Sequence, residues 1–302
     1  MYNEHPTSWH KGELAIQRRV VTDKRMAEIG PKFIRRFMPE QHRQYFENLC
    51  MLFIGYTDHY SLARASVIFG YPGFIESPNE TELVINTQNS MGDFIHQQLN
   101  VGDRLGLVGV EFDTKRRNRL NAIITDVSQK QITIKVLQSF GNCAKYIQSK
   151  SFITNPSYGH FSTTIRSELN ESDKQLINKA DTFFIASYFN DGKEFNNRGA
   201  DMSHRGGESG FVTINAKGQI LVQDYYGNGF FNTLGNLLHN PSASLLFFDW
   251  QKGHVLQLTV ISEILWNDKE QPNSTTKRTL RFTPTKIDFI KNGLAYLDAS
   301  LI

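Results

Sequence analysis

The sequence has few of the features that mark several large classes of protein. It contains only two cysteines in 302 residues, Cys50 and Cys143, and they form no Cys-x-x-Cys pair. Neither a disulfide framework nor a cysteine-based zinc site is therefore expected. No run of about 18 apolar residues occurs, and the first residues lack the apolar core of an export signal. These absences predict a cytoplasmic protein with no membrane partner.

An excess of charge is also missing. The formal net charge is +3, and the one short basic run is KRRNR at Lys115–Arg119. This is too little to predict a nucleic-acid surface. The sequence shows no Ser-His-Asp set, paired-carboxylate motif or Walker loop, so it assigns no catalytic residue, and we expect no metal site. The partner that these exclusions leave is a small molecule.

Short apolar runs dominate what is present. Residues 1–48 read as helical, with Ser8 as a helix cap. Two sets of short strands rich in β-branched and aromatic residues follow, in 49–150 and in 181–302, and a polar segment with a helix, 151–180, connects them. The pattern is typical of a mainly β protein with peripheral helices, built from small barrels or sandwiches.

The two strand sets align with each other. PGFIES pairs with SGFVTI, and QQLNVGDRLGLVGVEF lies ungapped on GNLLHNPSASLLFFDW, which sets Ser66 opposite Ser203 and Leu107 opposite Leu245. Any two β meanders agree in part when one is slid along the other, but here the apolar pattern keeps its order through several strands. We therefore favour a true duplication. Two tandem barrels in one chain would form an intramolecular pseudo-dimer.

The two copies differ in one strand. The second copy reads Ser203, His204, Arg205 and Gly206 where the first copy reads SVIF, so a cationic stretch replaces an apolar one. An exposed turn would tolerate polar residues in both copies. The asymmetry therefore predicts one ligand site, in the second copy.

The second copy also carries donors that suit a phosphate. Arg205 and Ser203 supply a guanidinium fork and a hydroxyl, and Asn232 and Thr233 open a short helix whose first amides can bind an anion. Aromatic side chains close to this helix offer faces for a flat ring. The alternative is an ordinary surface helix above core aromatics. The other candidate contacts in this stretch are Tyr226, Asn228 and Phe231.

Together these segments resemble the FMN-binding split barrel of the pyridoxamine 5′-phosphate oxidase-like superfamily, and more closely its double-barrel branch of uncharacterised proteins. The resemblance runs from His10 to Trp250. The segments that carry it are HKGELAIQRR, FMPEQHRQYF, PGFI, GLVGVEFDTKRRNRLNA, QSFGNCAKYIQ, ADTFFIAS, DMSHRGGESGFV and GNGFFNTLGNLLHNPSASLLFFDW.

The resemblance implies two tandem flavin-binding split barrels with FMN as the cofactor. In such barrels a basic strand and the start of the helix between the third and fourth strands hold the FMN phosphate. Those places correspond here to Ser203, His204 and Arg205, and to Asn232 and Thr233. The Lys or Arg common at the helix start is missing, so Arg205 would carry most of the charge, and FAD or heme stays open as an alternative cofactor.

The resemblance also implies roles for two further segments. The SFGN turn would bring Gln138, Ser139 and Asn142 to the flavin ring, although a polar turn that anchors the segment is an equal alternative. The hairpin arginines would solvate their turn or meet an anionic substrate or cofactor tail across the barrel interface. Cys143 reads as a small buried hydrophobe. The hairpin arginines are Arg116, Arg117 and Arg119.

The flavin would supply the reaction chemistry. The resemblance therefore implies an oxidoreductase that passes hydride or electrons from a reduced donor to a small organic acceptor. Two alternatives stay open: a non-catalytic flavin or heme carrier or sensor, in which His204 would bind the heme iron, and a structural protein whose sites have decayed. Split barrels dimerise by packing barrel on barrel, which a duplicated chain could satisfy internally. A homodimer is nevertheless expected, because the connecting segment carries the aromatic residues Phe152, Tyr158 and Phe161, which suit a further interface.

Overall fold

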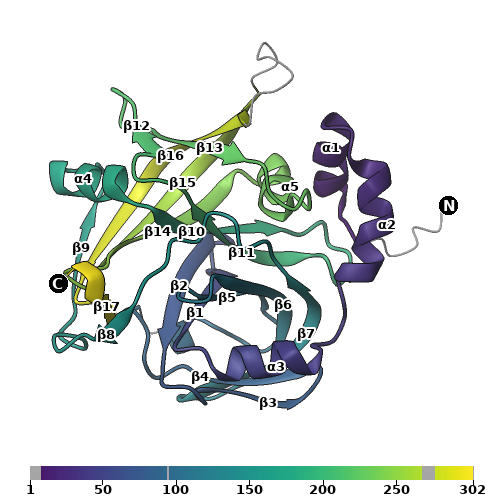
Figure 1. Ribbon diagram of the computed structural model, residues 1–302, viewed down its shortest axis with the longest axis horizontal. Coiled ribbons are helices and arrows are strands. Elements are labelled where there is room, and N and C mark those ends of the chain that lie inside the picture. Colours follow the sequence, from purple (N-terminus) through teal and green to yellow (C-terminus); the bar gives the residue numbers. More distant parts are fainter. Residues whose placement is uncertain (1–7, 94, 267–275, 302) are drawn as a thin grey trace.

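The computed structural model describes residues 8–93, 95–266 and 276–301 (Figure 1). Three helices open the chain: α1 (Lys11–Arg19), α2 (Asp23–Phe33) and α3 (Glu40–Glu47). The residue that caps α1 is His10 rather than Ser8, because the His10 side chain accepts a hydrogen bond from the Gly12 amide and its own amide donates to Glu13. No helix in these described ranges is long and apolar enough to cross a membrane.

The first barrel is an antiparallel sheet of seven strands in the order β2-β1-β5-β6-β7-β4-β3. A short 3₁₀ turn, η1 (Ile95–Gln97), precedes β5. The strands are β1 (Met51–Thr57), β2 (Ala63–Phe69), β3 (Ile75–Asn79), β4 (Glu82–Asn86), β5 (Arg104–Glu111), β6 (Arg116–Val127) and β7 (Gln131–Gly141).

The second barrel repeats this order strand for strand, as β11-β10-β14-β15-β16-β13-β12. A true helix, α5 (Asn232–His239), stands where the first barrel has η1. The strands are β10 (Thr182–Phe189), β11 (Gly199–Gly206), β12 (Val212–Ile214), β13 (Ile220–Tyr225), β14 (Ser242–Asp249), β15 (His254–Trp266) and β16 (Thr276–Lys291).

The connecting segment holds more structure than the helix that the sequence predicts. Besides α4 (Glu171–Lys179) it forms two short strands, β8 (Phe152–Thr154) and β9 (Ser162–Arg166). β9 extends the second sheet at β16, and β8 pairs with β17 (Tyr296–Asp298), which the 3₁₀ turn η2 (Ala299–Leu301) follows.

The strand register confirms the alignment of the two copies. One cross-sheet row of the first barrel has a counterpart, position for position, in the second barrel. This match sets Ser66 opposite Ser203 and Leu107 opposite Leu245, as the sequence predicts. The first row is Ser66, Ile54, Leu107, Leu120 and Ser139, and the second is Ser203, Ile185, Leu245, Leu258 and Ile287.

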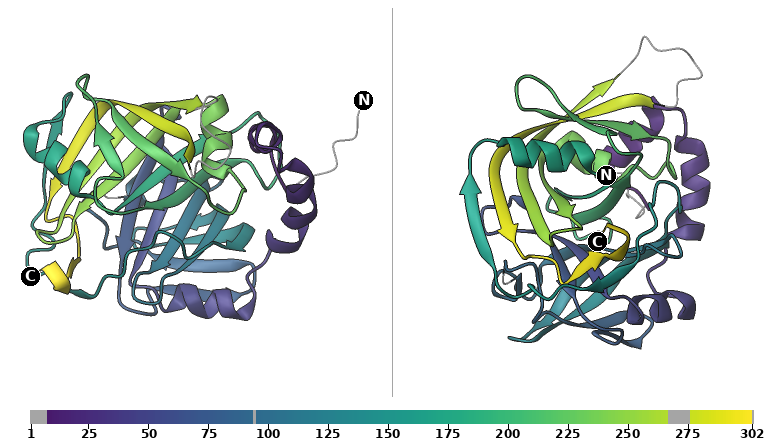
Figure 2. Two further views of the ribbon diagram at one scale, coloured as in Figure 1. Left: turned by 45° about the horizontal axis from the view of Figure 1, so that its top comes forward. Right: turned by 60° about the vertical axis from the view of Figure 1, so that its left-hand side comes forward.

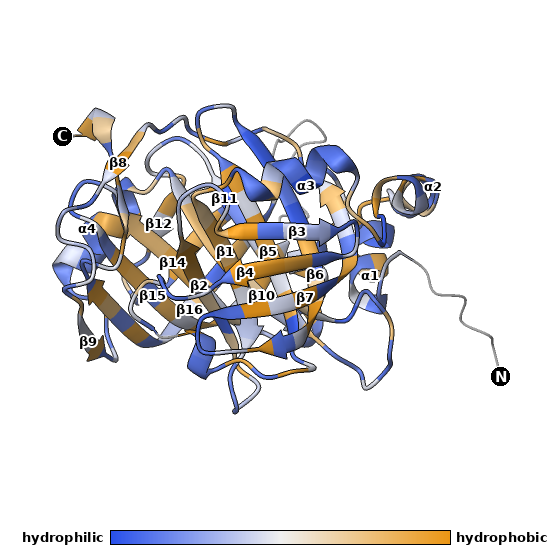
Figure 3. Cartoon of the chain, turned by 90° about the horizontal axis from the view of Figure 1, so that it is seen from below, coloured by the Kyte–Doolittle hydropathy of each residue, from blue (hydrophilic) through white to orange (hydrophobic). Residues whose placement is uncertain are grey.

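The barrels pack on each other along a shared apolar layer. Phe53 and Phe184, which occupy equivalent positions, stack with ring centroids 3.5 Å apart and planes 12° from parallel. Gly106 lets β5 approach β11 closely, because a Cβ atom there would lie 2.5 Å from the Asp201 Cα. Hydrophobic residues gather on central strands such as β1 and β14 (Figure 3). The chain is therefore a pseudo-dimer of two tandem split barrels.

The N-terminal helices divide between the two barrels: α3 packs on β3 of the first barrel, and α1 packs on one end of the second. α1 lies against α5, so closely that a Cβ atom on Gly12 would meet the Gly235 carbonyl oxygen at 2.1 Å (Figures 1 and 2). Helix α5 is thus held between its own barrel and α1. The first barrel's η1 has no such cover from α1.

Candidate functional site

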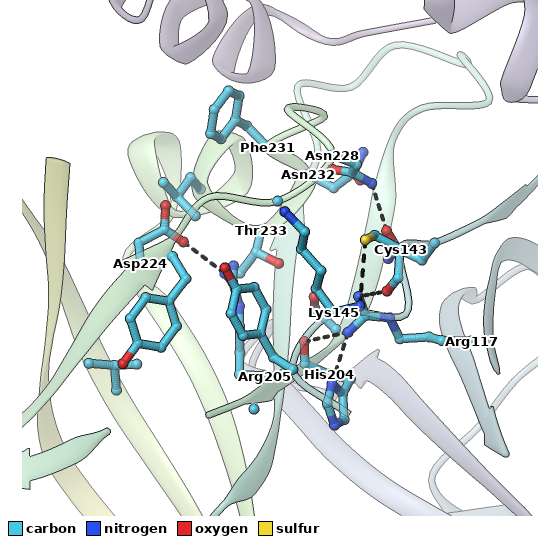
Figure 4. Close-up of a pocket in the computed structure, with 18 of the residues that line it drawn as sticks. Arg117, Cys143, Lys145, His204, Arg205, Asp224, Asn228, Phe231, Asn232 and Thr233 are labelled. Atoms are coloured by element: carbon cyan, nitrogen blue, oxygen red, sulfur yellow. Dashed lines mark hydrogen bonds and ion pairs between the residues drawn. The ribbon is translucent and has the colours of Figure 1, made fainter. Parts of the chain in front are cut away.

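One pocket gathers most of the predicted site residues at the junction of the two barrels (Figure 4). Its walls come from β11, β13, the start of α5, the beginning of β6 and the loop after β7, and it encloses about 110 Å³. The predicted residues that line it are Ser203, His204, Arg205, Gly206, Asn228, Phe231, Asn232 and Thr233 from the second barrel, and Arg117, Arg119 and Asn142 from the first.

The other predicted residues lie outside this pocket. The Ser139 hydroxyl bonds the Nδ1 atom of His42 at 3.0 Å, and Gln138 is buried on the side of the N-terminal segment, where its amide donates to the Ser8 carbonyl at 3.5 Å. Arg116 lies on the hairpin surface, 3.5 Å from Glu111. Tyr226 is 61% exposed. The structure therefore favours the anchoring alternative for Gln138 and Ser139.

Arg205 points from β11 toward Asp224, which the sequence interpretation missed. The Arg205 guanidinium lies 2.8 Å from one Asp224 oxygen, and Arg278 contacts the other oxygen at 2.8 Å and 2.9 Å. One carboxylate thus serves two guanidinium groups. Asp224 continues the inward alternation of Ile220 and Val222 on β13, and this pattern is the sequence signal that could have revealed it.

Arg117 brings a positive charge from the first barrel. Its two terminal nitrogens meet His204 Nδ1 at 2.8 Å and the Cys143 carbonyl at 2.7 Å. Neither contact is a carboxylate. Burial lowers the pKa of Arg117 to about 10, so the guanidinium keeps its charge at neutral pH.

His204 faces the layer between the barrels. Its ring packs edge-on against Phe184 and Phe112, and in Figure 4 it lies on the far side of Arg117 from the helix start. Burial, followed by the charge of Arg117, holds the pKa of His204 well below its usual range. The ring is therefore neutral, and we infer that Nδ1 accepts from Arg117 while Nε2 carries the proton.

The backbone amides at the start of α5 are free to bind an anion. Its N-cap residue, Phe231, has a left-handed backbone (φ 62°) and makes no side-chain cap. The first three residues of the helix, Asn232, Thr233 and Leu234, all line the pocket. Amides at an uncapped helix start have no partner within the helix, and the helix dipole favours an anion there.

The side chains of Asn232 and Thr233 are engaged elsewhere. The Asn232 amide donates to Glu13 of α1, and the Thr233 hydroxyl donates to Asp201 at 3.0 Å. Arg119 forms an ion pair with the other Asp201 oxygen. These two side chains therefore position α5, and what they offer a ligand is their backbone.

Glu13 is a buried acid that sequence analysis did not single out. Burial, partly offset by hydrogen bonds from His10 and Asn232, raises the pKa of Glu13 to about 8. The carboxyl group is thus mostly protonated at neutral pH and adds little negative charge near the pocket. Its capping position in α1 is visible in the sequence, but its contact with Asn232 joins positions too distant for any local pattern to reveal.

The pocket therefore carries more positive than negative charge. Arg117, Arg119 and Arg205 each keep a buried Nε–H group with no hydrogen-bond partner among the described residues. Lys145 lines the pocket as well and reaches toward Asn232 and Thr233 (Figure 4). Unpartnered buried donors are costly, so this arrangement suits a ligand with a multiply charged anionic group.

Cys143 corrects a sequence interpretation. The sequence suggested a buried small hydrophobe, but the side chain is exposed and lies at the pocket. It sits in the turn after β7, where the Lys145 amide approaches its sulfur at 3.5 Å. At the same rim Tyr225, one of the aromatic side chains that the sequence offers as a face for a flat ring, stacks on Tyr146, with ring centroids 5.1 Å apart. The sequence did not single out Tyr146.

Comparison with known proteins gives matches by structure alone. No protein-family model and no curated sequence matches this chain. Among solved structures, HutZ, the heme storage protein of Vibrio cholerae, has 14% identity and a TM-score of 0.30 and covers 41% of this chain and 95% of its own. An FAD-binding protein from Mesorhizobium loti has 9% identity and a TM-score of 0.29, with 43% and 97% covered.

A protein from Lactobacillus delbrueckii, provisionally named a pyridoxamine 5′-phosphate oxidase, has 12% identity and a TM-score of 0.31 and covers 40% of this chain and 94% of its own. In all three matches nearly the whole of the other protein covers less than half of this chain. The fold assignment itself comes from the strand order and register of the two sheets. These barrels are similar to those of pyridoxamine 5′-phosphate oxidase-like proteins, and this chain carries the barrel twice.

Proposed function

We propose that this protein binds FMN, with the FMN phosphate in the pocket between β11, β6 and the start of α5. The observation that carries the proposal is the set of arginines with buried, unpartnered N–H groups that line one pocket together with an uncapped helix start. Guanidinium forks and helix amides are the donors that phosphate prefers. Arg117, Arg205 and the amides of Asn232 to Leu234 would hold the phosphate, and Lys145 would lie beside it.

The size of the pocket favours a terminal phosphate. The enclosed volume of about 110 Å³ accommodates a phosphate, whereas pockets that bury a whole drug-sized ligand enclose roughly 300–1,000 Å³. FMN ends at its phosphate, while FAD continues through a second phosphate and a nucleoside. FMN is therefore the better fit.

The geometry of His204 argues against heme. A heme ligand needs an open ring nitrogen, but Nδ1 faces Arg117 at 2.8 Å and the rest of the ring lies among Phe184 and Phe112. His204 is also the sole histidine among the described residues that line the pocket.

We propose a flavin-dependent oxidoreductase that acts on a small organic acceptor. The bound flavin would supply hydride or electron transfer. The chain's own part would be to hold the phosphate with Arg205 and Arg117, to place the ring at the barrel junction, and to provide cationic N–H groups that stabilise negative charge developing nearby.

A non-catalytic flavin carrier is the second candidate. It is favoured by the state of the titratable groups at the pocket, because Asp224 is paired with Arg205 and Arg278 and His204 is buried and neutral. Neither is free to move a proton. Turnover of bound FMN with a reduced nicotinamide donor and a quinone acceptor would favour the enzyme; stable FMN binding without turnover would favour the carrier.

The binding test compares FMN with riboflavin, which has the same ring system but no phosphate. Arg205→Met is a suitable variant because Asp224 keeps Arg278 as a partner. A charge-assisted hydrogen bond contributes about 1.5–3 kcal/mol, so the Kd for FMN should rise roughly 10- to 150-fold while the Kd for riboflavin stays the same. Fluorescence quenching of the flavin measures both.

The matched control is Arg281→Met, which removes a guanidinium that pairs with Glu263 and does not line the pocket. It should leave both affinities unchanged. Equal losses for FMN and riboflavin in Arg205→Met, or no FMN binding by the wild type, would contradict the phosphate site. A Soret band in the purified protein would replace flavin with heme.

A further inference from the structure

The space at the pocket is too small for the flat part of the proposed ligand. An apolar cavity of about 150 Å³ holds one benzene ring, and the pocket encloses about 110 Å³. FMN has three fused rings. The phosphate therefore fits the structure as it stands, but the ring system needs room that some side chain must give up.

Tyr146 is the side chain placed to give up that room. It lines the pocket at the rim, and its ring stacks on Tyr225 with centroids 5.1 Å apart and planes 23° from parallel. Tyr225 lines the same pocket as Arg205 and its partner Asp224. The stacking face that Tyr146 covers is thus at the rim of the pocket that holds the proposed phosphate site.

Tyr146 is held in this place by few contacts. Its side chain is 38% exposed, and its hydroxyl donates one long hydrogen bond, 3.3 Å, to the Tyr226 carbonyl. Its backbone is left-handed (φ 68°), a conformation that side-chain-bearing residues seldom adopt and that clusters at functional sites.

The backbone beneath the side chain is fixed. The Tyr146 carbonyl oxygen packs on β11 so closely that a Cβ atom on Gly206 would lie 2.0 Å from it. On the other side of the pocket the Asn228 amide donates to Asn142 at 2.7 Å and ties the same loop to the second barrel. A movement that uncovers Tyr225 would therefore involve the Tyr146 side chain and not the whole loop.

We infer that the Tyr146 ring holds the place of the ligand's flat ring system and swings out when the ligand binds, leaving the face of Tyr225 as the stacking surface. This inference rests on the proposed function. It identifies Tyr225 as the ring-binding residue and Tyr146 as the residue that ring-bearing ligands must displace, whereas a ligand with a phosphate and no ring binds without displacing it.

The experiment compares wild type, Tyr146→Ala and Tyr226→Ala with two probes, FMN and inorganic phosphate. Tyr226 is the matched control, because it is an exposed tyrosine that does not line the pocket. For Tyr146→Ala we expect FMN to associate about tenfold faster, equivalent to about 1.4 kcal/mol, with phosphate affinity unchanged. Stopped-flow quenching of flavin fluorescence gives the rate, and calorimetry gives the phosphate affinity.

Tyr146→Phe separates the ring from the hydroxyl. It keeps the stacked ring and loses the bond to the Tyr226 carbonyl, so its association rate should lie between wild type and Tyr146→Ala. FMN binding that is equal or slower in Tyr146→Ala would overturn the inference and make Tyr146 a wall of the site. If neither wild type nor Tyr146→Ala binds FMN, the proposed function is overturned. If Tyr146→Ala binds FMN and wild type does not, both proposals are supported.

Discussion

The two barrels share strand order and register but use the same positions in opposite ways. By register, Arg205 corresponds to Ile68, and Arg117 corresponds to Val255. Ile68 and Val255 are both fully buried, and Val255 belongs to the apolar layer between the barrels. One side of the pseudo-dimer thus keeps a charged site, with one arginine from each barrel, where the other side has core residues at the same positions.

The polar contacts across the interface show the same inversion. Arg119 of the first barrel pairs with Asp201 of the second. At the equivalent positions Gln257 of the second barrel accepts a hydrogen bond from Arg64 of the first at 2.7 Å. The interface therefore keeps a polar link on both sides of its pseudo-symmetry, and the first barrel supplies the cation in both, from β6 on one side and from β2 on the other.

The largest expected effect comes from placing an arginine in the first barrel at the position equivalent to Arg205. Ile68 is 0% exposed, and the position equivalent to Asp224 is Thr87, also 0% exposed. Ile68→Arg would bury a large cation with no carboxylate at that position, and we expect the free energy of unfolding to fall by at least about 3 kcal/mol. Urea-induced unfolding measures the loss, and adding Thr87→Asp should restore part of it.

The reverse exchange, Arg205→Ile, is the control. It should reduce the preference for FMN over riboflavin roughly 10- to 150-fold and change the free energy of unfolding by no more than about 1 kcal/mol. If Ile68→Arg were tolerated and two FMN molecules bound per chain, the first barrel would be an unused site rather than a filled one.

A second test uses the pair on the pseudo-symmetry axis. Phe53 and Phe184 are both fully buried and stacked on each other. Phe53→Ala and Phe184→Ala should each cost about 3–5 kcal/mol in unfolding free energy. Phe184 also packs on His204, so Phe184→Ala alone should weaken FMN binding. Equal effects of both variants on FMN affinity would contradict a site confined to one side.

A smaller effect concerns the acid beneath α5, which has no counterpart at η1. The folded-state pKa of Glu13 is raised from 4.5 to about 8, so the folded protein binds an extra proton and loses stability as pH rises toward 8. Above about pH 7.5 the histidines with lowered pKa, such as His10, are largely neutral in both states. Between pH 7.5 and 9 we expect a loss of about 1 kcal/mol.

The Glu13→Gln variant should flatten that decline, because a neutral amide does not titrate. Urea unfolding at pH 7.5 and pH 9 gives the two free energies. A decline as steep as that of the wild type would show that another group is responsible.

Much of the architecture follows from local pattern. Alternating apolar strands and two matching segment orders predict a mainly β chain with a duplicated barrel, and the register of Ser66 and Ser203 confirms the alignment. The polar stretch Ser203–Gly206 also predicts where the pocket lies. These features depend on side-chain periodicity, which is encoded within a few residues.

The remainder depends on contacts between distant segments. Glu13 meets Asn232 only because α1 folds onto α5, and Arg117 reaches His204 only across the interface. The sequence leaves Ser139 between a ring contact and an anchoring turn, and its contact with His42 of α3 favours the anchoring turn. Cys143 looks like a core residue in isolation and becomes exposed because its turn projects from the barrel edge.

The stacking of Phe53 on Phe184 has an evolutionary consequence. In a dimer of identical chains every substitution appears twice, so a residue that improves one site changes the other as well. Here the two halves are tethered, and a tether holds partners at a high effective concentration whatever the dilution. Each half is then free to vary alone. A cation such as Arg205 can be gained in one half while the equivalent position in the other half, Ile68, becomes apolar.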